Sequence, residues 1–429
     1  MFGMTNKKVS TESYKGVRDF YPEDQAVQNY IFGVMRKVAE SWGYLEYSAS
    51  VLEPLELYKS KSSEEIVNEQ IYNFIDRGGR EVALRPEMTP TVARMVAARI
   101  QELPKPVRWY SIPNLFRYEK PQRGRLREHW QLNVDMFGIS SPYADTEIIM
   151  VAADIMKKFG AKSEDFVIKI NSRELLQKIL EKAGVAGGEA IFVYRLIDKK
   201  EKMPEDEFRR SMAALVGEEP AEKILEMLYF DGALTTMFHS EASAVWLEEV
   251  INILKSRGVS NVLFSPTLTR GFDYYTGVVF EVFDTNKENP RSLFGGGRYD
   301  NLAENFVNEK IPAFGFGMGD VTVHDFLETH GLLPEISSST DLYIAVAPET
   351  DLAEVYKVAD TFREKGINVA VDISDKKLAD QLKSLEKTKV PFVMTVGATE
   401  IKSQRFVLRD TNTREEKIGS IEEIAGMIK

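Results

Sequence analysis

The chain has 429 residues, of which 43% are hydrophobic and 28% charged, which is typical of a globular protein with two or three domains. It contains no cysteine, and its four histidines lack metal-ligand spacing, so disulfides and thiolate metal sites are excluded and a structural zinc site is disfavoured. The net charge of −11 argues against general coating of nucleic acid but permits a local basic site. Because neither a secretory leader nor an apolar run of membrane-spanning length is found, we expect a cytoplasmic protein without membrane contact.

The N-terminal part of the chain alternates helix and strand signals. Apolar residues recur at helical spacing over about 25–42, and Gly43 is a suitable helix stop. Residues 44–52 are expected to form a strand, and 69–84 a hairpin whose turn lies at 76–80. These elements are expected to begin a sheet domain.

The stretch 85–90 reads Arg-Pro-Glu-Met-Thr-Pro and stands just before a helix predicted over 91–100. It is unusual because two prolines bracket a carboxylate and a hydroxyl. A Glu or Thr at such a place is often only the cap of the following helix. The residues alone favour that simpler interpretation.

A basic hairpin is predicted over 116–135, because Pro and Gly separate two runs of mixed aromatic and polar residues. Its first strand ends at 116–118, and its second strand begins at Glu128. The loop between them is strongly basic, and Glu119 is its one acidic residue. Its basic residues are Arg117, Lys120, Arg123, Arg125 and Arg127.

The second strand of this hairpin has a polar face, since Gln131, Asn133 and Asp135 alternate with apolar residues. Buried polar groups need hydrogen-bond partners, so this face meets either water or a ligand. Arginine forks suit phosphate oxygens, and an aspartate with a glutamine suits a small amine or an imidazole. A solvated hairpin with a positive tip is the simpler alternative.

From 173 to 258 the pattern is helical, with apolar stripes that end at Gly184 and Gly258. Strand signals are scarce in this stretch. We therefore expect a helical domain inserted between two halves of a sheet domain.

Strand signals return at 262–264 and over 268–283, a run that includes Arg270, Asp273 and two tyrosines. Two glycine-rich stretches follow, at 294–300 and 313–320. Glycines at alternate positions leave one strand face nearly bare, so either a flat ring or another strand can lie on it. They do not form the separated-glycine fingerprint of a dinucleotide-binding turn.

Residues 334–340 are interpreted as a linker, because the pattern changes after them. Strand and helix signals then alternate, which predicts a small separate α/β domain over 341–429. Its expected strands lie at 342–347, 369–373, 392–396 and 406–408, and its expected helices at 352–365, at 376–387 and from 421.

Four of these stretches together resemble the histidyl-tRNA synthetases, a class II aminoacyl-tRNA synthetase family. They are the Arg-Pro-Glu-Met-Thr turn at 85–89, the basic hairpin with Phe-Arg-Tyr-Glu at 116–119 and Gln131, Arg-Gly-Phe-Asp-Tyr-Tyr at 270–275, and Gly-Gly-Arg-Tyr-Asp at 296–300. The resemblance extends from about Gly16 to the C-terminus. It implies an α+β fold with an antiparallel-sheet catalytic domain in two parts, an inserted helical domain and a C-terminal anticodon-binding α/β domain. The corresponding ranges are 1–172 and 259–333 for the catalytic domain, 173–258 for the insertion and 341–429 for the C-terminal domain.

The resemblance also implies an activity, namely a histidine–tRNA ligase that forms histidyl-adenylate from L-histidine and ATP and transfers histidine to the 3′ end of tRNA(His). Arg117 and Arg270 would be catalytic, one on each side of the α-phosphate. Mg²⁺, with unassigned ligands, and a second copy in a homodimer are the other implied partners. Histidine binding is expected of Glu87, Thr89, Gln131, Asp135, Tyr274 and Tyr275, ATP binding of Arg117, Glu119, Arg270, Gly317 and Gly319, and tRNA binding of Gln122, Arg123 and Arg125.

Within the implied histidine pocket, the carboxylate and hydroxyl of the 85–90 turn suit the α-ammonium group. Tyr274 and Asp135 suit the imidazole N–H groups, because ring donors need acceptors at a fixed separation.

Three positions depart from the family pattern. Asp135 stands where the family usually has the longer Glu, and Ser50 stands where the dimer-interface motif usually has a proline. Thr322 stands where an arginine normally holds the γ-phosphate. Either Arg298 or an arginine of the hairpin loop replaces that cation, or activation is weakened.

Two other functions stay open at this point. A synthetase-like paralogue can bind histidine and regulate a partner enzyme without charging tRNA. A generic nucleotide-dependent ligase is the third interpretation. The retained α-phosphate arginines and the C-terminal domain favour the synthetase.

Overall fold

The computed structural model describes residues 10–59, 66–200, 203–229, 238, 241–269, 274–385 and 388–428. The chain divides into two compact units, Met1–Pro334 and Glu335–Lys429, and each unit has its own sheet. Within the described ranges, no helix is both long and apolar enough to cross a membrane. The boundary between the units falls beside the linker that the sequence predicts.

The first unit combines a large sheet, a small sheet and helices. Its helices are α1 (Pro22–Ser41), α2 (Glu56–Lys59), the π-helical turn η1 (Ile66–Gln70), α3 (Thr89–Arg99), α4 (Pro142–Lys158), α5 (Arg173–Lys182), α6 (Gly188–Asp198), α7 (Glu205–Val216), α8 (Glu218–Leu228), α10 (Ala242–Ser256), the 3₁₀ turn η3 (Leu302–Asn305) and α11 (Asp320–Thr329). Its strands are β1 (Leu45–Glu46), β2 (Leu52–Pro54), β3 (Asn73–Ile75), β4 (Glu81–Leu84), β5 (Val107–Ser111), β6 (Asn114–Phe116), β7 (Glu128–Phe137), β8 (Phe166–Ser172), β9 (Val262–Phe264), β10 (Val278–Asp284), β11 (Ser292–Arg298) and β12 (Ala313–Gly319).

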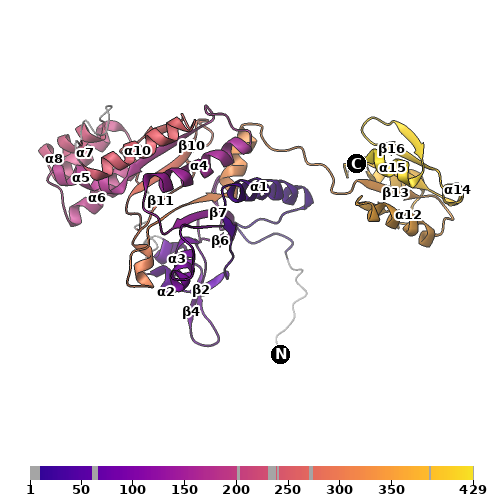
Figure 1. Cartoon of the computed structure of the whole chain (residues 1–429), viewed down its shortest axis with the longest axis horizontal. Helices are drawn as coiled ribbons and strands as arrows, with labels where there is room; N and C mark the ends of the chain where they lie inside the picture. The colour runs from indigo at the N-terminus through magenta and orange to yellow at the C-terminus, as the bar shows by residue number, and fades with distance from the viewer. Residues whose placement is uncertain are drawn as a thin grey trace. The chain divides into compact units, whose positions relative to one another are not determined.

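The large sheet orders its described strands β1-β5-β7-β12-β11-β10-β8-β9, and β6 also pairs with β7 (Figure 1). The pairs at its centre are antiparallel, whereas the outer pairs β1–β5 and β8–β9 are parallel. Strands β2, β4 and β3 form the small separate sheet. Because β7 and β12 are far apart in the chain but adjacent in the sheet, the predicted hairpin meets the second glycine-rich stretch directly.

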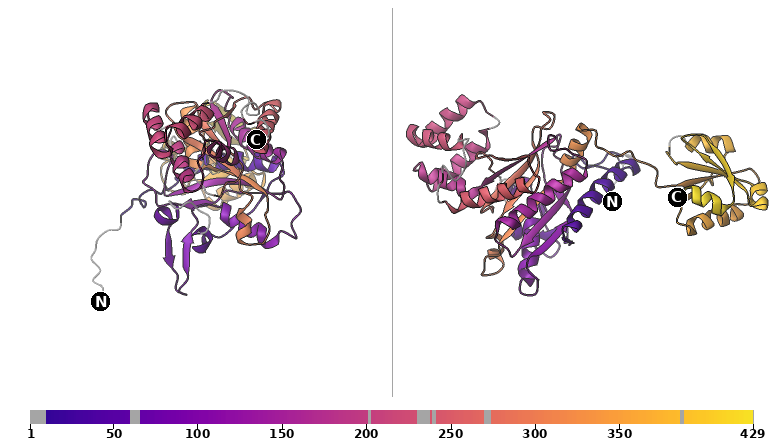
Figure 2. Two further views of the ribbon diagram at one scale, coloured as in Figure 1. Left: turned by 90° about the vertical axis from the view of Figure 1, so that its left-hand side faces the viewer. Right: turned by 45° about the horizontal axis from the view of Figure 1, so that its top comes forward.

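One face of the large sheet is apolar and is covered by helices α1, α4 and α10. Alternate residues of β7 and β12, such as Val134 and Phe316, point to this face and are buried. Helix α4 is buried along most of its length, and the hydroxyl of Ser141 caps it by accepting from the backbone N–H of Ala144 at 3.2 Å. Figure 2 shows α1 and α4 side by side across this face. The opposite face is therefore left for the polar side chains.

Helices α5, α6, α7, α8 and α10 follow one another between β8 and β9, where the sequence predicts a helical segment. The buried residues of α5 include Leu175, Leu176 and Ile179, which belong to the apolar stripe seen in the sequence. The hydroxyl of Ser172 caps this helix by accepting from the backbone N–H of Leu175 at 3.4 Å. In Figure 1, α5 to α8 gather at one end of the unit.

Some element predictions were wrong in detail. The strand expected over 44–52 is instead split into β1 and β2, which belong to different sheets, and the Ser50 hydroxyl accepts from the backbone N–H of Leu52 at the turn before β2. Helix α11 begins at Asp320, directly after the second glycine-rich stretch ends in β12. Residues 268–269 and 274–277 lie outside any strand, and 270–273 are not among the described residues.

The second unit is an α/β domain, as predicted. Its sheet has the order β14-β13-β15-β16-β17, with β13 parallel to β14 and β15 and the other pairs antiparallel. Helices α12 and α15 pack on one face, and α13 packs on the other. The elements are β13 (Leu342–Val346), α12 (Leu352–Glu364), β14 (Val369–Val371), α13 (Leu378–Leu385), β15 (Phe392–Val396), α14 (Ala398–Ser403), β16 (Phe406–Asp410), β17 (Glu416–Gly419) and α15 (Ile421–Ile428).

Candidate active site

Gly315, Gly317 and Gly319 of β12 lie beneath the polar side chains of the sheet and are called the glycine floor. Gly315 of β12 pairs with Asp135 of β7, and Gly319 pairs with Gln131. A Cβ atom on Gly315 would lie 2.1 Å from Oδ1 of Asp135, and one on Gly317 would lie 2.7 Å from the amide carbon of Gln131. The alternate glycines of β12 are therefore required because the polar side chains of β7 lie over them.

The carboxylate of Asp135 is buried on this floor, with 3% of the residue exposed. Its Oδ1 accepts a hydrogen bond from the hydroxyl of Tyr299, while its Oδ2 has no hydrogen-bond partner among the described residues. Burial raises the pKa of the Asp135 carboxyl to about 7, and the Tyr299 hydrogen bond opposes that rise. A ligand N–H group would satisfy Oδ2 and favour the ionised form.

Tyr299 is a pocket residue that we did not single out from the sequence. It follows β11 directly, and its ring centroid lies 5.8 Å from that of Tyr274. Its position in the Gly-Gly-Arg-Tyr-Asp stretch was the available signal, but its contact with Asp135 depends on the pairing of β11, β12 and β7.

Glu87 and Tyr274 form the second buried polar group of the site. The hydroxyl of Tyr274 donates to Oε2 of Glu87 at 3.0 Å. Burial, followed by the Glu87 charge, raises the pKa of Tyr274 well above its usual value, and the nearby Thr89 hydroxyl opposes this rise. Tyr275 completes an aromatic wall, with its ring centroid 4.9 Å from that of Tyr274.

The capping interpretation of Glu87 and Thr89 was wrong. Met88 occupies the N-cap position of α3, and no side chain forms a capping hydrogen bond there. Thr89 is already the first residue of α3, and the Glu87 carboxylate accepts from Tyr274 instead. Both side chains lie beside the hydroxyl of Tyr274.

Arg117 lies at the end of β6, where its Nε donates to the carbonyl oxygen of Pro86 at 2.8 Å. Within the described ranges, its guanidinium has no ion-pair partner. His129 shares the polar side of β7, and burial, with the charges of Arg117 and Arg18, lowers the pKa of His129 to about 3. The cationic charge at this end of the floor is therefore carried by arginine and not by histidine. Arg270, the expected catalytic counterpart, lies outside the described residues.

The hairpin loop is held by hydrogen bonds, although its tip is accessible. Arg123 is about half exposed and donates to Asn289 Oδ1 and Thr329 Oγ1, both at 3.3 Å. Gln122 accepts from Arg291 at 3.1 Å. Arg125 lies 3.5 Å from the carboxylate of Glu119. These contacts fix the loop against the rest of the unit, while basic side chains remain at its surface. The alternative of a hairpin tip that only meets water does not include such contacts.

The position of Thr322 carries no positive charge, and the positive charge of Arg298 is already paired with carboxylates. The Thr322 hydroxyl donates to the carbonyl oxygen of Leu293 at 2.6 Å. Arg298 pairs with Phe314 in the sheet, on the apolar side, and its guanidinium is bound by the carboxylates of Asp145 and Asp300. The suggestion that Arg298 replaces the missing arginine is therefore wrong.

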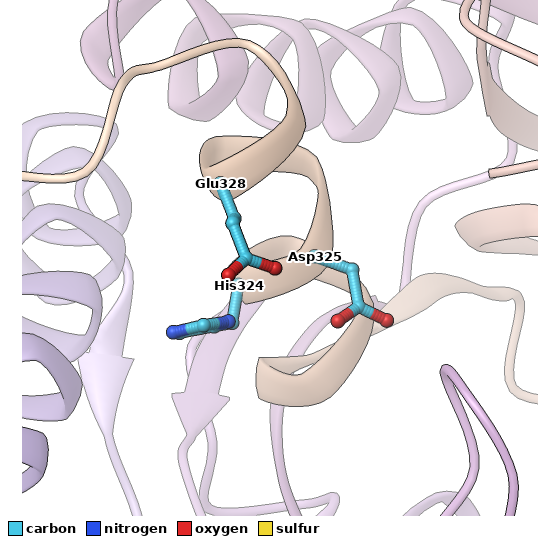
Figure 3. A group of neighbouring side chains, drawn as sticks. All are labelled: His324, Asp325 and Glu328. Atoms are coloured by element: carbon cyan, nitrogen blue, oxygen red, sulfur yellow. The ribbon is translucent and has the colours of Figure 1, made fainter. Parts of the chain in front are cut away.

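Helix α11 carries a group of possible metal ligands close to the hairpin loop. Figure 3 shows His324, Asp325 and Glu328 leaving the same helix, and one ligand atom from each lies within 4.8 Å of the others. Asp325 lies 4.0 Å from the guanidinium of Arg123, whose positive charge opposes a metal ion there. We assign no metal to this group.

A family profile described as Histidyl-tRNA synthetase matches residues 16–321, and one described as Anticodon binding domain matches 341–429. A histidine–tRNA ligase of Leptospira biflexa is 43% identical to the chain over 99% of both proteins, and that of Haloarcula marismortui is 39% identical over 94% of both. A histidyl-tRNA synthetase structure from Nostoc sp. PCC 7120 matches with a TM-score of 0.84 at 23% identity, covering 98% of this chain and 99% of that one. An ATP phosphoribosyltransferase regulatory subunit/histidyl-tRNA synthetase structure from Bacillus halodurans matches with a TM-score of 0.73 at 24% identity, covering 89% and 97%. These matches confirm the predicted fold class, and the chain belongs to the histidyl-tRNA synthetase family.

Proposed function

We propose that this protein is a histidine–tRNA ligase. It forms histidyl-adenylate and pyrophosphate from L-histidine and ATP, then transfers the histidyl group to the 3′ end of tRNA(His). The observation that carries this proposal is the buried carboxylate of Asp135, whose Oδ2 has no partner among the described residues and lies beside a glycine floor. The match to the histidyl-tRNA synthetase family indicates the reaction. The buried acceptor oxygen of Asp135 is suited to the N–H group of an imidazole.

The histidine pocket lies between the two buried carboxylates. Asp135 accepts the imidazole N–H, and Glu87, with Thr89, receives the α-ammonium group. Gln131 lies over the glycine floor beside them. Tyr274, which we expected to contact the imidazole, is assigned to orient Glu87, because its hydroxyl already donates to that carboxylate. Tyr275 closes the aromatic wall.

Adenylation requires positioning and charge stabilisation more than proton transfer. An ionised carboxylate oxygen of histidine attacks the α-phosphorus, the bond to the bridging oxygen of pyrophosphate breaks, and pyrophosphate leaves with the electron pair. Arg117 is held by Pro86, so its guanidinium is oriented before the charge on the α-phosphate develops. We assign the opposite side of the phosphate to Arg270.

The other ATP contacts follow the floor of the sheet. Gly317, over which Gln131 lies, and Gly319 carry no side chain of their own, so we assign the nucleotide to the backbone of this end of β12. Glu119 of the hairpin loop is assigned to the same nucleotide. Glu281 of β10 pairs with Gly295 and so faces the same side of the sheet. We assign Glu281 to Mg²⁺, because this ion is usually held by one or two carboxylates together with phosphate oxygens. Mg²⁺ would neutralise charge on the phosphates, and hairpin arginines replace the cation missing at Thr322.

The remaining assignments concern tRNA and assembly. Gln122, Arg123 and Arg125 contact the acceptor end, the inserted helical domain (173–258) holds the acceptor arm, and the C-terminal domain (341–429) binds the anticodon. The catalytic domain then consists of 1–172 and 259–333. We also propose a cytoplasmic homodimer. The dimer is supported by exposed apolar side chains at Leu45, Phe74 and Ile75, which a partner subunit would cover.

Histidine-dependent exchange of pyrophosphate into ATP tests the proposal. Exchange with histidine but not with arginine or glutamine, followed by charging of tRNA(His), is the expected result. Saturable histidine binding without exchange would refute the ligase and favour a regulatory paralogue. Exchange with several amino acids would favour a generic ligase.

A further inference from the structure

A buried ion pair lies on the apolar side of the large sheet and has no role in the reaction proposed above. Arg298 is 5% exposed, and Asp145 of α4 is 0% exposed. The Nε of Arg298 donates to Oδ1 of Asp145 at 3.1 Å, and its Nη2 donates to the same oxygen. The indole N–H of Trp246 donates to Oδ2 at 2.7 Å. Apolar side chains often replace such a pair without loss of stability, so stability alone does not explain it.

Arg298 lies between two positions that border the site. Side chains alternate between the two faces of a strand, so positions 297 and 299 face the polar side while the Arg298 side chain faces the apolar side. A Cβ atom on Gly297 would lie 2.7 Å from Cδ1 of Tyr275, so the tyrosine ring lies over this glycine. Tyr299 donates to Asp135. Fixing Arg298 from the apolar side therefore also fixes the backbone that makes both contacts.

Arg298 also holds the segment that leads from the aromatic wall into β10. Its carbonyl oxygen accepts from the backbone N–H of Thr276 at 2.7 Å. A Cβ atom on Gly277 would lie 3.1 Å from Cδ of Arg298, so the arginine side chain passes directly over this glycine. The Thr276 hydroxyl accepts from the backbone N–H of Asp300 at 3.2 Å. Oδ1 of Asp300 accepts from Nη1 of Arg298 at 2.9 Å and from the backbone N–H of Ala313 at 3.0 Å, which closes the network.

Building on the proposed ligase activity, we propose that Arg298 is a positioning residue for histidine adenylation. Its guanidinium bridges two carboxylates, one on α4 in the helical layer and one shortly after β11, and its planar fork fixes the geometry between them. Through Thr276 and β11 it keeps Tyr275 and Tyr299 in place. Histidine then enters a pocket whose aromatic side is already ordered, so less binding energy is lost in ordering it.

The same network reaches the inserted helices. The ring of Trp246, on α10, has its centroid 5.7 Å from the guanidinium carbon of Arg298. The first residue of α5, Arg173, donates its backbone N–H to the carbonyl oxygen of Gly277 at 2.9 Å. Trp246→Phe removes the N–H that Asp145 accepts and keeps an aromatic ring. It should therefore act in the same direction as a change at Arg298, with a smaller effect.

The test is Arg298→Lys, which keeps the positive charge beside Asp145 but loses the fork that spans both carboxylates. We expect the histidine kcat/KM in pyrophosphate exchange to fall about 10- to 100-fold, because a displacement of about 1 Å at a reacting group costs up to about 100-fold. The ATP KM should stay unchanged. Histidine affinity measured by calorimetry should fall in the same variant, which gives a readout that does not depend on adenylation.

Two substitutions of Thr276 test the network without touching the buried charges. Thr276→Val removes the hydroxyl that accepts from Asp300 and should lower the histidine kcat/KM about three- to tenfold, the range for one lost neutral hydrogen bond. Thr276→Ser keeps the hydroxyl and should retain the wild-type value. A loss in Thr276→Ser as large as that in Thr276→Val would contradict the assignment of the hydroxyl.

Arg108→Lys is the matched control. Arg108 of β5 donates through Nε and Nη2 to the two carboxylate oxygens of Glu147, at 2.7 and 3.0 Å, so the control loses a comparable fork to another carboxylate of α4. A lower Tm in both lysine variants, with unchanged histidine kinetics in Arg298→Lys, would show a purely structural role and overturn the inference. Equal changes in the histidine and ATP KM values would overturn it as well. A wild-type protein without histidine-dependent exchange would instead refute the ligase proposal itself.

Discussion

The substitution Asp135→Asn gives the sharpest test of the pocket, because it changes charge and donor pattern with little change in shape. In the wild type, Oδ1 accepts from Tyr299 and Oδ2 is available to the imidazole N–H. With the asparagine oxygen kept toward Tyr299, the amide N–H₂ would face the ligand and present a donor to a donor.

The expected loss follows from the kind of bond removed. A hydrogen bond to a charged group contributes about 1.5 to 3 kcal/mol. The histidine KM in pyrophosphate exchange should therefore rise roughly 10- to 150-fold, with the ATP KM little changed. An unchanged histidine KM would refute the assignment of Asp135 to the imidazole.

Asp135→Asn should weaken histidine binding but should stabilise the unliganded protein at high pH. Burial raises the pKa of Asp135 from 3.8 to about 7, so the folded state binds this proton more tightly than the unfolded state. The resulting stability is fully present below about pH 4 and is lost as the pH rises through 7, a difference of roughly 4 kcal/mol at most. Asp135→Asn removes this dependence, so its Tm should exceed that of the wild type at pH 8 by more than at pH 5.

Thermal unfolding at the two pH values, with and without histidine, measures this effect. Asp154→Asn on α4 is the control, because it makes the same chemical change on the far side of the sheet, where Asp154 accepts from the indole N–H of Trp42. A Tm difference between Asp135→Asn and the wild type that does not change with pH would show that the carboxylate is ionised throughout this range.

Three further predictions test the rest of the site. Arg117→Lys keeps a positive charge but loses the planar fork, so kcat for pyrophosphate exchange should fall about 100-fold with an unchanged Tm, and normal turnover would remove Arg117 from the mechanism. Arg123→Ala should raise the tRNA KM in aminoacylation and leave histidine adenylation nearly intact, whereas equal loss of both would instead indicate an ATP contact. Gly315→Ala places a Cβ 2.1 Å from Asp135 Oδ1 and 2.8 Å from the backbone oxygen of Val134, so it should lower the free energy of unfolding by about 1 to 3 kcal/mol, and a normal denaturation midpoint would show that the floor tolerates a side chain.

Local patterns in the chain were sufficient to predict most elements and to select the candidate site residues. Helical stripes and glycine stops predicted α1, α5 and α10, and alternation of polar and apolar residues predicted β7 with its polar face. The motif stretches also predicted a common pocket for Glu87, Gln131, Asp135 and Tyr274, which stays a prediction. These features are encoded within a few neighbouring residues, so periodicity or a motif reveals them.

The tertiary structure decided which groups share a hydrogen bond. Tyr299 reaches Asp135 because β11, β12 and β7 are adjacent in the sheet although they are distant in the chain. The same pairing turns Arg298 to the apolar side, where Asp145 binds it. Such contacts depend on strand order and register, and a register shift of one residue would move each of these side chains to the other face.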